Sequence, residues 1–166
     1  MRSAVGFNAG FLSLVDIQDG TGFYVVAVPK ISKKMGKLWI GCPGTVIMAY
    51  GGEYVARGSV RPEEKKYARA IEVDFATKLV FTDKVRERVL AARNKDHEVL
   101  HEILYREGGG FAQHSLRPNC EAVIENDGVR VLIRSIENIF FGQCITIHYG
   151  QECVQWMLNN GQEVLR

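Results

Sequence analysis

Short stretches rich in β-branched and aromatic residues, each bounded by glycine or another turn former, are the feature that most constrains the fold of this chain. Val, Ile, Tyr and Phe favour strands, and glycines between such runs favour tight turns. An Asp-Gly pair lies between two apolar runs within 121–136 and predicts a hairpin. We therefore predict a mainly β, α+β domain with strands in the stretches 22–31, 44–52, 69–75, 78–81, 121–136 and 143–150.

One segment departs from the β pattern. Apolar residues recur at helical spacing between 83 and 105, with Thr82 placed before them as an N-cap. The Asn-Lys-Asp stretch at 94–96 predicts a break, so the segment is either one helix or two. We interpret the charged stretch 61–69 as a solvated loop or a short helix that begins at Pro62.

Composition limits the classes of function. The chain has 166 residues, of which 46% are hydrophobic, and this is enough for one globular domain over 1–166. A net charge of +2 creates no field that would draw the protein to nucleic acid or to an anionic membrane, so neither partner is expected. Residues 1–20 lack the cleavage site of a signal peptide, and no apolar run is long enough to span a membrane.

The cysteines are widely spaced and form no C-x-x-C pair. This spacing argues against a zinc ribbon and against a disulfide scaffold. Free cysteines in a reducing, intracellular compartment are the expected state of Cys42, Cys120, Cys144 and Cys153.

Four short blocks occur in a suggestive order. Residues 108–120, GGGFAQHSLRPNC, contain three glycines that predict close backbone packing and a Pro-Asn pair that predicts a turn. Together with DGTGFYVVAV, GTVIMAYGGEY and ITIHYG, they resemble the four signature blocks of SET-domain lysine methyltransferases, over about residues 15–157. The resemblance implies a β-clip fold of short curved sheets with a C-terminal pseudoknot. It also implies S-adenosylmethionine as cofactor and methyl transfer to a protein lysine, most often in a histone tail.

The resemblance places the cofactor site on the first and third blocks. Gly20 and Gly22 match the glycines that surround the methionine part of the cofactor, and Tyr24 follows them in the predicted strand. His114 matches the histidine of the third block, where Gln113 replaces the family's Asn. Considered without the resemblance, the glycines form an ordinary turn and His114 is a hydrogen-bonded structural residue.

Two tyrosines are the catalytic candidates that the resemblance implies. Tyr50 and Tyr149 would line the substrate-lysine channel, and Tyr149 would direct its hydroxyl at the reacting amine. Ile147, also in this channel, stands where the family often has Phe or Tyr, which predicts room for di- or trimethylation. Ala49 and His148 replace a Glu and an Asp of the family. Taken alone, Tyr149 is better interpreted as a strand-end tyrosine held by its hydroxyl.

The C-terminal residues 151–166 are the candidate segment for closing the site. Leu116 stands where zinc-bearing relatives have Cys, and only Cys153 follows the fourth block, so we expect no post-SET zinc site and no other metal. Trp156 would stack on adenine, anchor the core or contribute to self-association. The compact form resembles small viral and bacterial SET proteins, which makes a homodimer an expectation to test.

Substrate identity has little support from the residues. Glu53, Glu72 and Asp74 offer an acidic surface for a basic tail, or are simply solvated. We expect a nuclear location if the substrate is a histone and a cytosolic one otherwise. The departures at Gln113, Ala49 and His148 leave a second reading open, a catalytically inactive SET-like module that binds peptide or cofactor.

Overall fold

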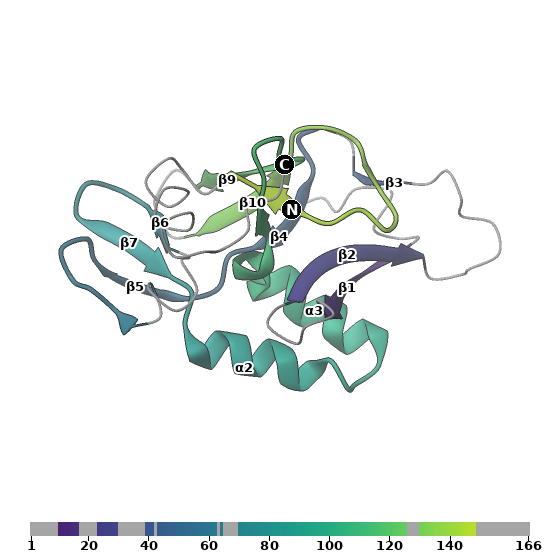
Figure 1. Cartoon of the computed structure of the whole chain (residues 1–166), viewed down its shortest axis with the longest axis horizontal. Coiled ribbons are helices and arrows are strands. Elements are labelled where there is room, and N and C mark those ends of the chain that lie inside the picture. The colour runs from purple at the N-terminus through teal and green to yellow at the C-terminus, as the bar shows by residue number, and fades with distance from the viewer. Residues whose placement is uncertain are drawn as a thin grey trace.

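The computed structural model describes residues 10–16, 23–29, 39–41, 43–62, 64, 70–125 and 130–148. Short sheets dominate these residues, and two helices lie on one side of them (Figure 1). None of the helices within these ranges is long and apolar enough to cross a membrane. The mainly β, α+β class predicted from the sequence is confirmed.

Two antiparallel units form the centre of the fold. Strand β1 (Gly10–Asp16) pairs with β2 (Phe23–Pro29), so that Leu12 faces Ala27 in the register. The second unit has the order β4-β10-β9, with β4 at Val46–Ala49, β9 at Cys120–Ile124 and β10 at Val131–Ser135. The β9–β10 pairing, with Val131 opposite Ile124, confirms the antiparallel hairpin predicted within 121–136.

A separate sheet with the order β5-β7-β6 lies at one end of the molecule (Figure 1). Its strands are β5 (Glu53–Ala56), β6 (Ala70–Glu72) and β7 (Thr77–Val80). Two further pairs complete the described strands: β3 (Trp39–Gly41) with β11 (Ile139–Phe140), and β8 (Gln113–His114) with β12 (Thr146–Ile147).

The predicted helical segment is two helices. Helix α2 (Asp83–Ala92) is capped by Thr82, whose hydroxyl accepts a hydrogen bond from the Val85 N–H. Helix α3 (His97–Glu107) is capped in the same way by Asp96, through the Val99 N–H. The break therefore falls at the Asn-Lys-Asp stretch, because Asp96 stabilises a new helix start better than a helix interior. A short 3-10 turn, η2 (Gly109–Phe111), follows α3.

The strand prediction missed β1, β3, β5, β8 and β11. In β1 the buried residues Leu12 and Leu14 alternate with more exposed ones, which is the period-2 signal of a half-buried strand. The others are two to four residues long and carry too few residues for periodicity to show.

The core joins these units around an aromatic cluster. Phe81 is fully buried and packs edge-to-face on Phe111, with ring centroids 5.2 Å apart, and on Tyr50 at 6.5 Å. Such pairs contribute about 0.5–1.5 kcal/mol each beyond the burial of their area. Helix α3 packs against β1 and β4. Through Phe81 this cluster joins the second and third sequence blocks, to which Tyr50 and Phe111 belong.

Candidate active site

Tyr50 lies where β4 ends, against the glycine run. Its N–H donates to the Val131 carbonyl at 2.8 Å, and it forms an isolated antiparallel bridge with Gly108. A Cβ at Gly109 would lie 2.7 Å from the Tyr50 Cα, and a Cβ at Gly110 would lie 2.2 Å from the Phe81 ring. The predicted close backbone approach at the three glycines is thus confirmed. Tyr50 itself is buried.

Gln113 connects three parts of the candidate site. Its N–H donates to the Ile145 carbonyl at 3.1 Å, which joins the third block to the fourth. Its side-chain Nε2 donates to the Phe23 carbonyl at 2.8 Å, one residue after the predicted cofactor glycine Gly22. Strand β2 is in turn bonded to the fourth block, because the Ile145 N–H donates to the Val25 carbonyl at 2.8 Å. The side-chain amide nitrogen is therefore engaged by the fold.

The third and fourth blocks lie side by side as parallel strands. In the register of β8 and β12, Thr146 is opposite Gln113 and Ile147 is opposite His114. The Ser115 N–H extends this pairing by donating to the Ile147 carbonyl at 2.9 Å. Segments separated by more than thirty positions are thus held in contact, as the predicted fold requires. The residues after 148, which would complete a pseudoknot, lie outside the described ranges.

Asn119, near the end of the third block, also bonds to residues at the start of β12 and just before it. Its Nδ2 donates to the Cys144 carbonyl at 2.8 Å, and its Oδ1 accepts from the Thr146 N–H at 2.9 Å. The Asn119 N–H donates to the Thr146 Oγ1 at 3.0 Å. Both side chains are buried, so these bonds are made away from competing water. We call these contacts among Asn119, Cys144 and Thr146 the Asn119 crossing.

Two histidines meet at the end of β12. The ring of His114 packs edge-to-face on that of His148, with centroids 4.9 Å apart. His114 is 3% exposed, and burial lowers its pKa below the ordinary 6.5, with a further contribution from His148. The neutral imidazole is therefore the favoured form of His114 in the folded protein. Its predicted role at the cofactor stays a prediction.

The other predicted site residues fall into two groups. Ile147 is buried in the core cluster, and Tyr24 is half-buried on β2, opposite Val15 in the register. Their assignments to the substrate channel and the cofactor stay predictions. Outside the described residues lie Gly20, Gly22, Tyr149, Trp156 and the whole predicted closing segment 151–166.

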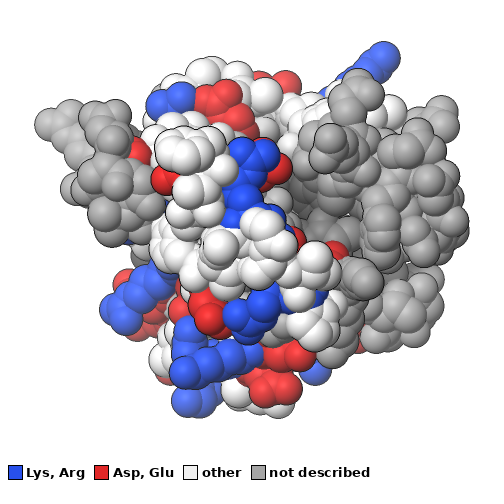
Figure 2. Space-filling model, turned by 90° about the vertical axis from the view of Figure 1, so that its left-hand side faces the viewer, with Lys and Arg blue, Asp and Glu red and all other residues white. Residues whose placement is uncertain are grey.

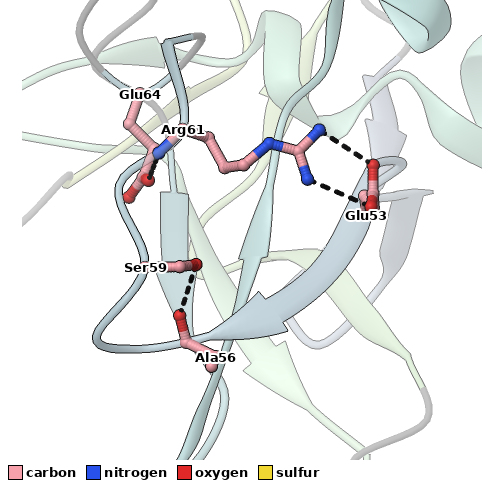
Figure 3. Close-up of polar contacts among 5 residues, drawn as sticks. All are labelled: Glu53, Ala56, Ser59, Arg61 and Glu64. Atoms are coloured by element: carbon pink, nitrogen blue, oxygen red, sulfur yellow. Dashed lines mark hydrogen bonds and ion pairs between the residues drawn. The ribbon is translucent and has the colours of Figure 1, made fainter.

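A network of charges follows the second block (Figure 3). Arg61 binds the Glu53 carboxylate through both terminal nitrogens, at 3.1 Å each. Glu64 accepts from the Arg61 N–H at 2.7 Å and from the Lys78 Nζ at 2.5 Å. Lys78 also donates to the Ser59 carbonyl at 2.6 Å. We call residues 57–62 and 64, held over β5 and β7 by these bonds, the ionic segment.

Sequence reasoning did not identify Arg61, Lys78 or Thr146 as important residues. A signal for Arg61 was present, because Pro62 is at the first helical position and Glu64 follows Arg61 by three residues, as in a capping box. Pro62 and Glu64 are both helical, which matches the short-helix interpretation. No local pattern reveals Thr146 or Lys78, since their partners lie 27 and 14 positions away, respectively.

The acidic residues considered for a basic tail are all engaged. Besides the Glu53–Arg61 pair, Glu72 pairs with Arg57 at 2.8 Å, and Asp74 Oδ1 accepts from the N–H groups of Ala76 and Thr77. Figure 2 shows acidic and basic side chains interspersed on the face that carries this end of the molecule. Among the described residues there, charges of both signs are mixed, so we consider charge recognition carboxylate by carboxylate.

The described ranges contain two cysteines, Cys120 and Cys144, and no candidate metal centre. No group of three or more His, Cys, Asp or Glu side chains gathers there in a metal-binding arrangement. Cys120 and Cys144 are free cysteines, and burial strongly raises the pKa of the Cys120 thiol. Cys120 is therefore protonated and inert as a nucleophile. Cys42 and Cys153 lie outside the described residues.

Comparison with known proteins identifies the family. The SET-domain family model matches residues 41–150, which is 110 of the 166 residues, and the chain belongs to this family. A crystal structure of a Plasmodium falciparum protein described as a histone methyltransferase is similar over 85% of this chain and 94% of its own, at 14% identity and a TM-score of 0.49. No curated protein matches by sequence. SET-domain proteins are generally protein lysine methyltransferases that use S-adenosylmethionine.

Proposed function

We propose that this protein transfers methyl groups from S-adenosylmethionine to the side-chain amine of a lysine in a protein substrate, with a histone tail as the first substrate class to test. The observation that carries the proposal is the meeting of the blocks in space. Within the matched family region, β8 and β12 pair in parallel, and Gln113 bonds both to that pair and to β2. Residues far apart in the chain thus converge at one place.

Gln113 supplies a test of whether the cofactor fits. Both hydrogen bonds of its Nε2 go to main-chain carbonyls, of Phe23 and Phe111. Its Oε1 accepts no hydrogen bond from the described residues. The Gln113 Oε1 therefore remains as an acceptor for a ligand. S-adenosylmethionine carries amino groups that can donate to it. Gln113, His114 and the stretch at Gly20–Gly22 would hold the cofactor, which fits this donor and acceptor chemistry.

The cofactor, when bound, supplies a methyl group on a sulfonium, a leaving group that is already activated. A substrate lysine that has lost its ammonium proton to water would present its nitrogen lone pair to that methyl group. The residues of this chain have to orient and desolvate that nitrogen. The reference lysine pKa is about 10.4, and an apolar channel lowers it. Alignment can supply roughly 7–11 kcal/mol of the barrier reduction.

Tyr50 is the described residue best suited to such a channel. It is fixed by the Val131 carbonyl, the Gly108 bridge and the Phe81 ring, so its position is set before any substrate arrives. Tyr149 is proposed as the second channel residue, with its hydroxyl directed at the reacting amine. Preorganised positioning of this kind costs no reorganisation when the substrate binds.

Calorimetric titration of S-adenosylmethionine and of its demethylated product tests the proposal. We expect micromolar binding that survives in Tyr149→Phe, together with transfer of radiolabelled methyl to histones that this variant loses. Gln113→Asn restores the residue that the family has at this position, and we expect this variant to bind S-adenosylmethionine more tightly. Absence of binding by either ligand at millimolar concentration would contradict the proposal.

The second candidate is a SET-like module that binds a peptide without methyl transfer. Ala49 and His148 favour it, because they replace a Glu and an Asp of the family's signature blocks. Such a module would bind lysine-containing peptides and show no methyl transfer. The calorimetry and the radiolabel assay together separate the two candidates.

A further inference from the structure

We propose that Glu53 recognises a basic side chain flanking the target lysine of the substrate, and that Arg61 occupies its carboxylate in the free protein. The inference rests on the proposed function, whose substrate it specifies further. The Arg61 fork binds both oxygens of Glu53 at 3.1 Å, the geometry with which an arginine of another chain would bind the same carboxylate (Figure 3). Arg61 is thus an internal stand-in for a substrate residue.

The Glu53–Arg61 pair is exposed enough for a substrate side chain to replace Arg61 at the Glu53 carboxylate. The side chains of Arg61 and Glu53 are 32% and 56% exposed. Exposed ion pairs contribute little in water, so replacing one guanidinium by another costs little. Arg61, and to a smaller degree Lys84, lower the pKa of the Glu53 carboxyl, so it is ionised and ready to accept a cation at neutral pH.

The distance from Tyr50 suits a residue close to the target lysine. Glu53 follows Tyr50 by three positions, and three residues of extended chain span at most about 10 Å. The connection is rigid, because a Cβ at Gly51 would lie 2.4 Å from the Glu107 Cβ and one at Gly52 would lie 2.2 Å from the Val80 carbonyl oxygen. A basic residue two or three positions from the target lysine would therefore reach Glu53.

The other carboxylates of the same sheet are less suited to this task. Glu64 is half-buried and bound to Lys78, whose residue is 8% exposed. Asp74 is part of a turn, where it accepts from two main-chain N–H groups. Glu72 pairs with Arg57 in a comparably exposed contact, but its strand position is opposite Lys78, two residues further from Tyr50 in the register than that of Glu53. Glu72 is therefore the matched control.

The experiment uses eleven-residue peptides with a central lysine, in which one arginine is moved through positions −4 to +4 and compared with glutamine. Methyl transfer and fluorescence anisotropy are measured for each peptide. We expect arginine at one or two positions to lower KM about two- to fivefold, the range of an exposed ion pair, with kcat unchanged. Glu53→Gln should remove this preference, Arg61→Gln should strengthen it, and Glu72→Gln should leave it intact.

Charge reversal at Glu53 separates direct recognition of arginine from a structural role, because a structural role would not change which peptide side chain is preferred. Glu53→Lys should transfer the preference from arginine to glutamate at the same peptide position. An unchanged arginine preference in Glu53→Gln and Glu53→Lys, or no preference in the wild type, overturns the inference. The experiment distinguishes failure of this inference from failure of the proposed function. Anisotropy measures peptide binding at Glu53 without catalysis, whereas calorimetry measures whether the cofactor binds. If no peptide binds or reacts, the inference fails as well.

Discussion

The Asn119 crossing and the ionic segment join distant parts of the chain by opposite means. The crossing uses neutral groups that are hydrogen-bonded to one another, with the Asn119 and Thr146 side chains buried, and it connects residues 25 to 27 positions apart. The ionic segment is held by charged side chains, and in its pair with Glu53 the side chains of Arg61 and Glu53 are 32% and 56% exposed. The first arrangement therefore specifies one geometry, whereas the second leaves its partners exchangeable.

The largest expected effect is on the crossing. Asn119→Ala removes three side-chain hydrogen bonds and leaves the Thr146 N–H and the Cys144 carbonyl without them. We expect a loss of about 4 kcal/mol in the free energy of unfolding, seen as a fall of roughly 10 °C in Tm. Gln143→Ala is the control, because that exposed amide accepts one bond from the Phe140 N–H, and it should cost about 1 kcal/mol or less. Equal costs for the two variants would break the comparison.

The next effect concerns the glycine run at 108–110. A Cβ at Gly110 would lie 2.2 Å from the ring of Phe81, which is fully buried and cannot move freely. We expect Gly110→Ala to lower the free energy of unfolding by about 3 kcal/mol in urea titrations. Gly58→Ala is the control, since nothing lies within 4 Å of a Cβ there. Partial rescue by Phe81→Leu would show that the ring causes the loss.

Two other ion pairs of the ionic segment, Glu64–Lys78 and Glu72–Arg57, differ in burial. We expect the more buried pair to contribute more to the free energy of unfolding. Glu64→Gln leaves the Lys78 ammonium in an almost buried position, and we expect a loss of about 2 kcal/mol. Glu72→Gln breaks an exposed pair and should change the free energy of unfolding by less than about 0.5 kcal/mol. Urea midpoints of both variants at low and high salt measure the difference. A larger loss for Glu72→Gln would mean that burial does not set the strength of these contacts.

The smallest expected effect is a pH dependence at His114. Its pKa is lowered in the folded protein, so as the pH falls through about 6.5 the unfolded chain begins to bind a proton that the folded chain does not. Stability from this group is therefore present above about pH 6.5 and declines as the pH falls. We expect the urea midpoint to drop less with pH in His114→Asn than in the wild type. His148→Gln should reduce the decline, because it removes the second cause of the lowered pKa. Parallel pH curves for wild type and His114→Asn would contradict this.

Local chemistry made much of the fold predictable. Thr82 and Asp96 cap helices where the sequence placed a start and a break, and the Asp-Gly pair predicted the β9–β10 hairpin. The glycine run was expected to be close-packed because glycine permits such an approach, and it is. The ordered blocks also led to the family that comparison with known proteins identifies.

Contacts between distant residues could not be predicted in the same way. Nothing around Thr146 indicates that its N–H bonds to Asn119, and nothing around Lys78 indicates that it pairs with Glu64. These contacts depend on how the sheets are brought together, which no local pattern encodes. The roles of Tyr149, Trp156 and the two cofactor glycines stay predictions that the proposed titrations address.

The parallel pairing of β8 with β12 has a consequence for synthesis on the ribosome. Asn119 emerges 25 to 27 residues ahead of the groups that it binds. At roughly 5–20 residues per second, it waits about 1–5 s for them, with its amide exposed to water. The candidate site therefore cannot assemble progressively as the chain emerges, and it forms in one late step when the Cys144–Thr146 stretch arrives. A codon-dependent pause before that stretch would lengthen the interval in which the nascent chain is open to aggregation or chaperone capture.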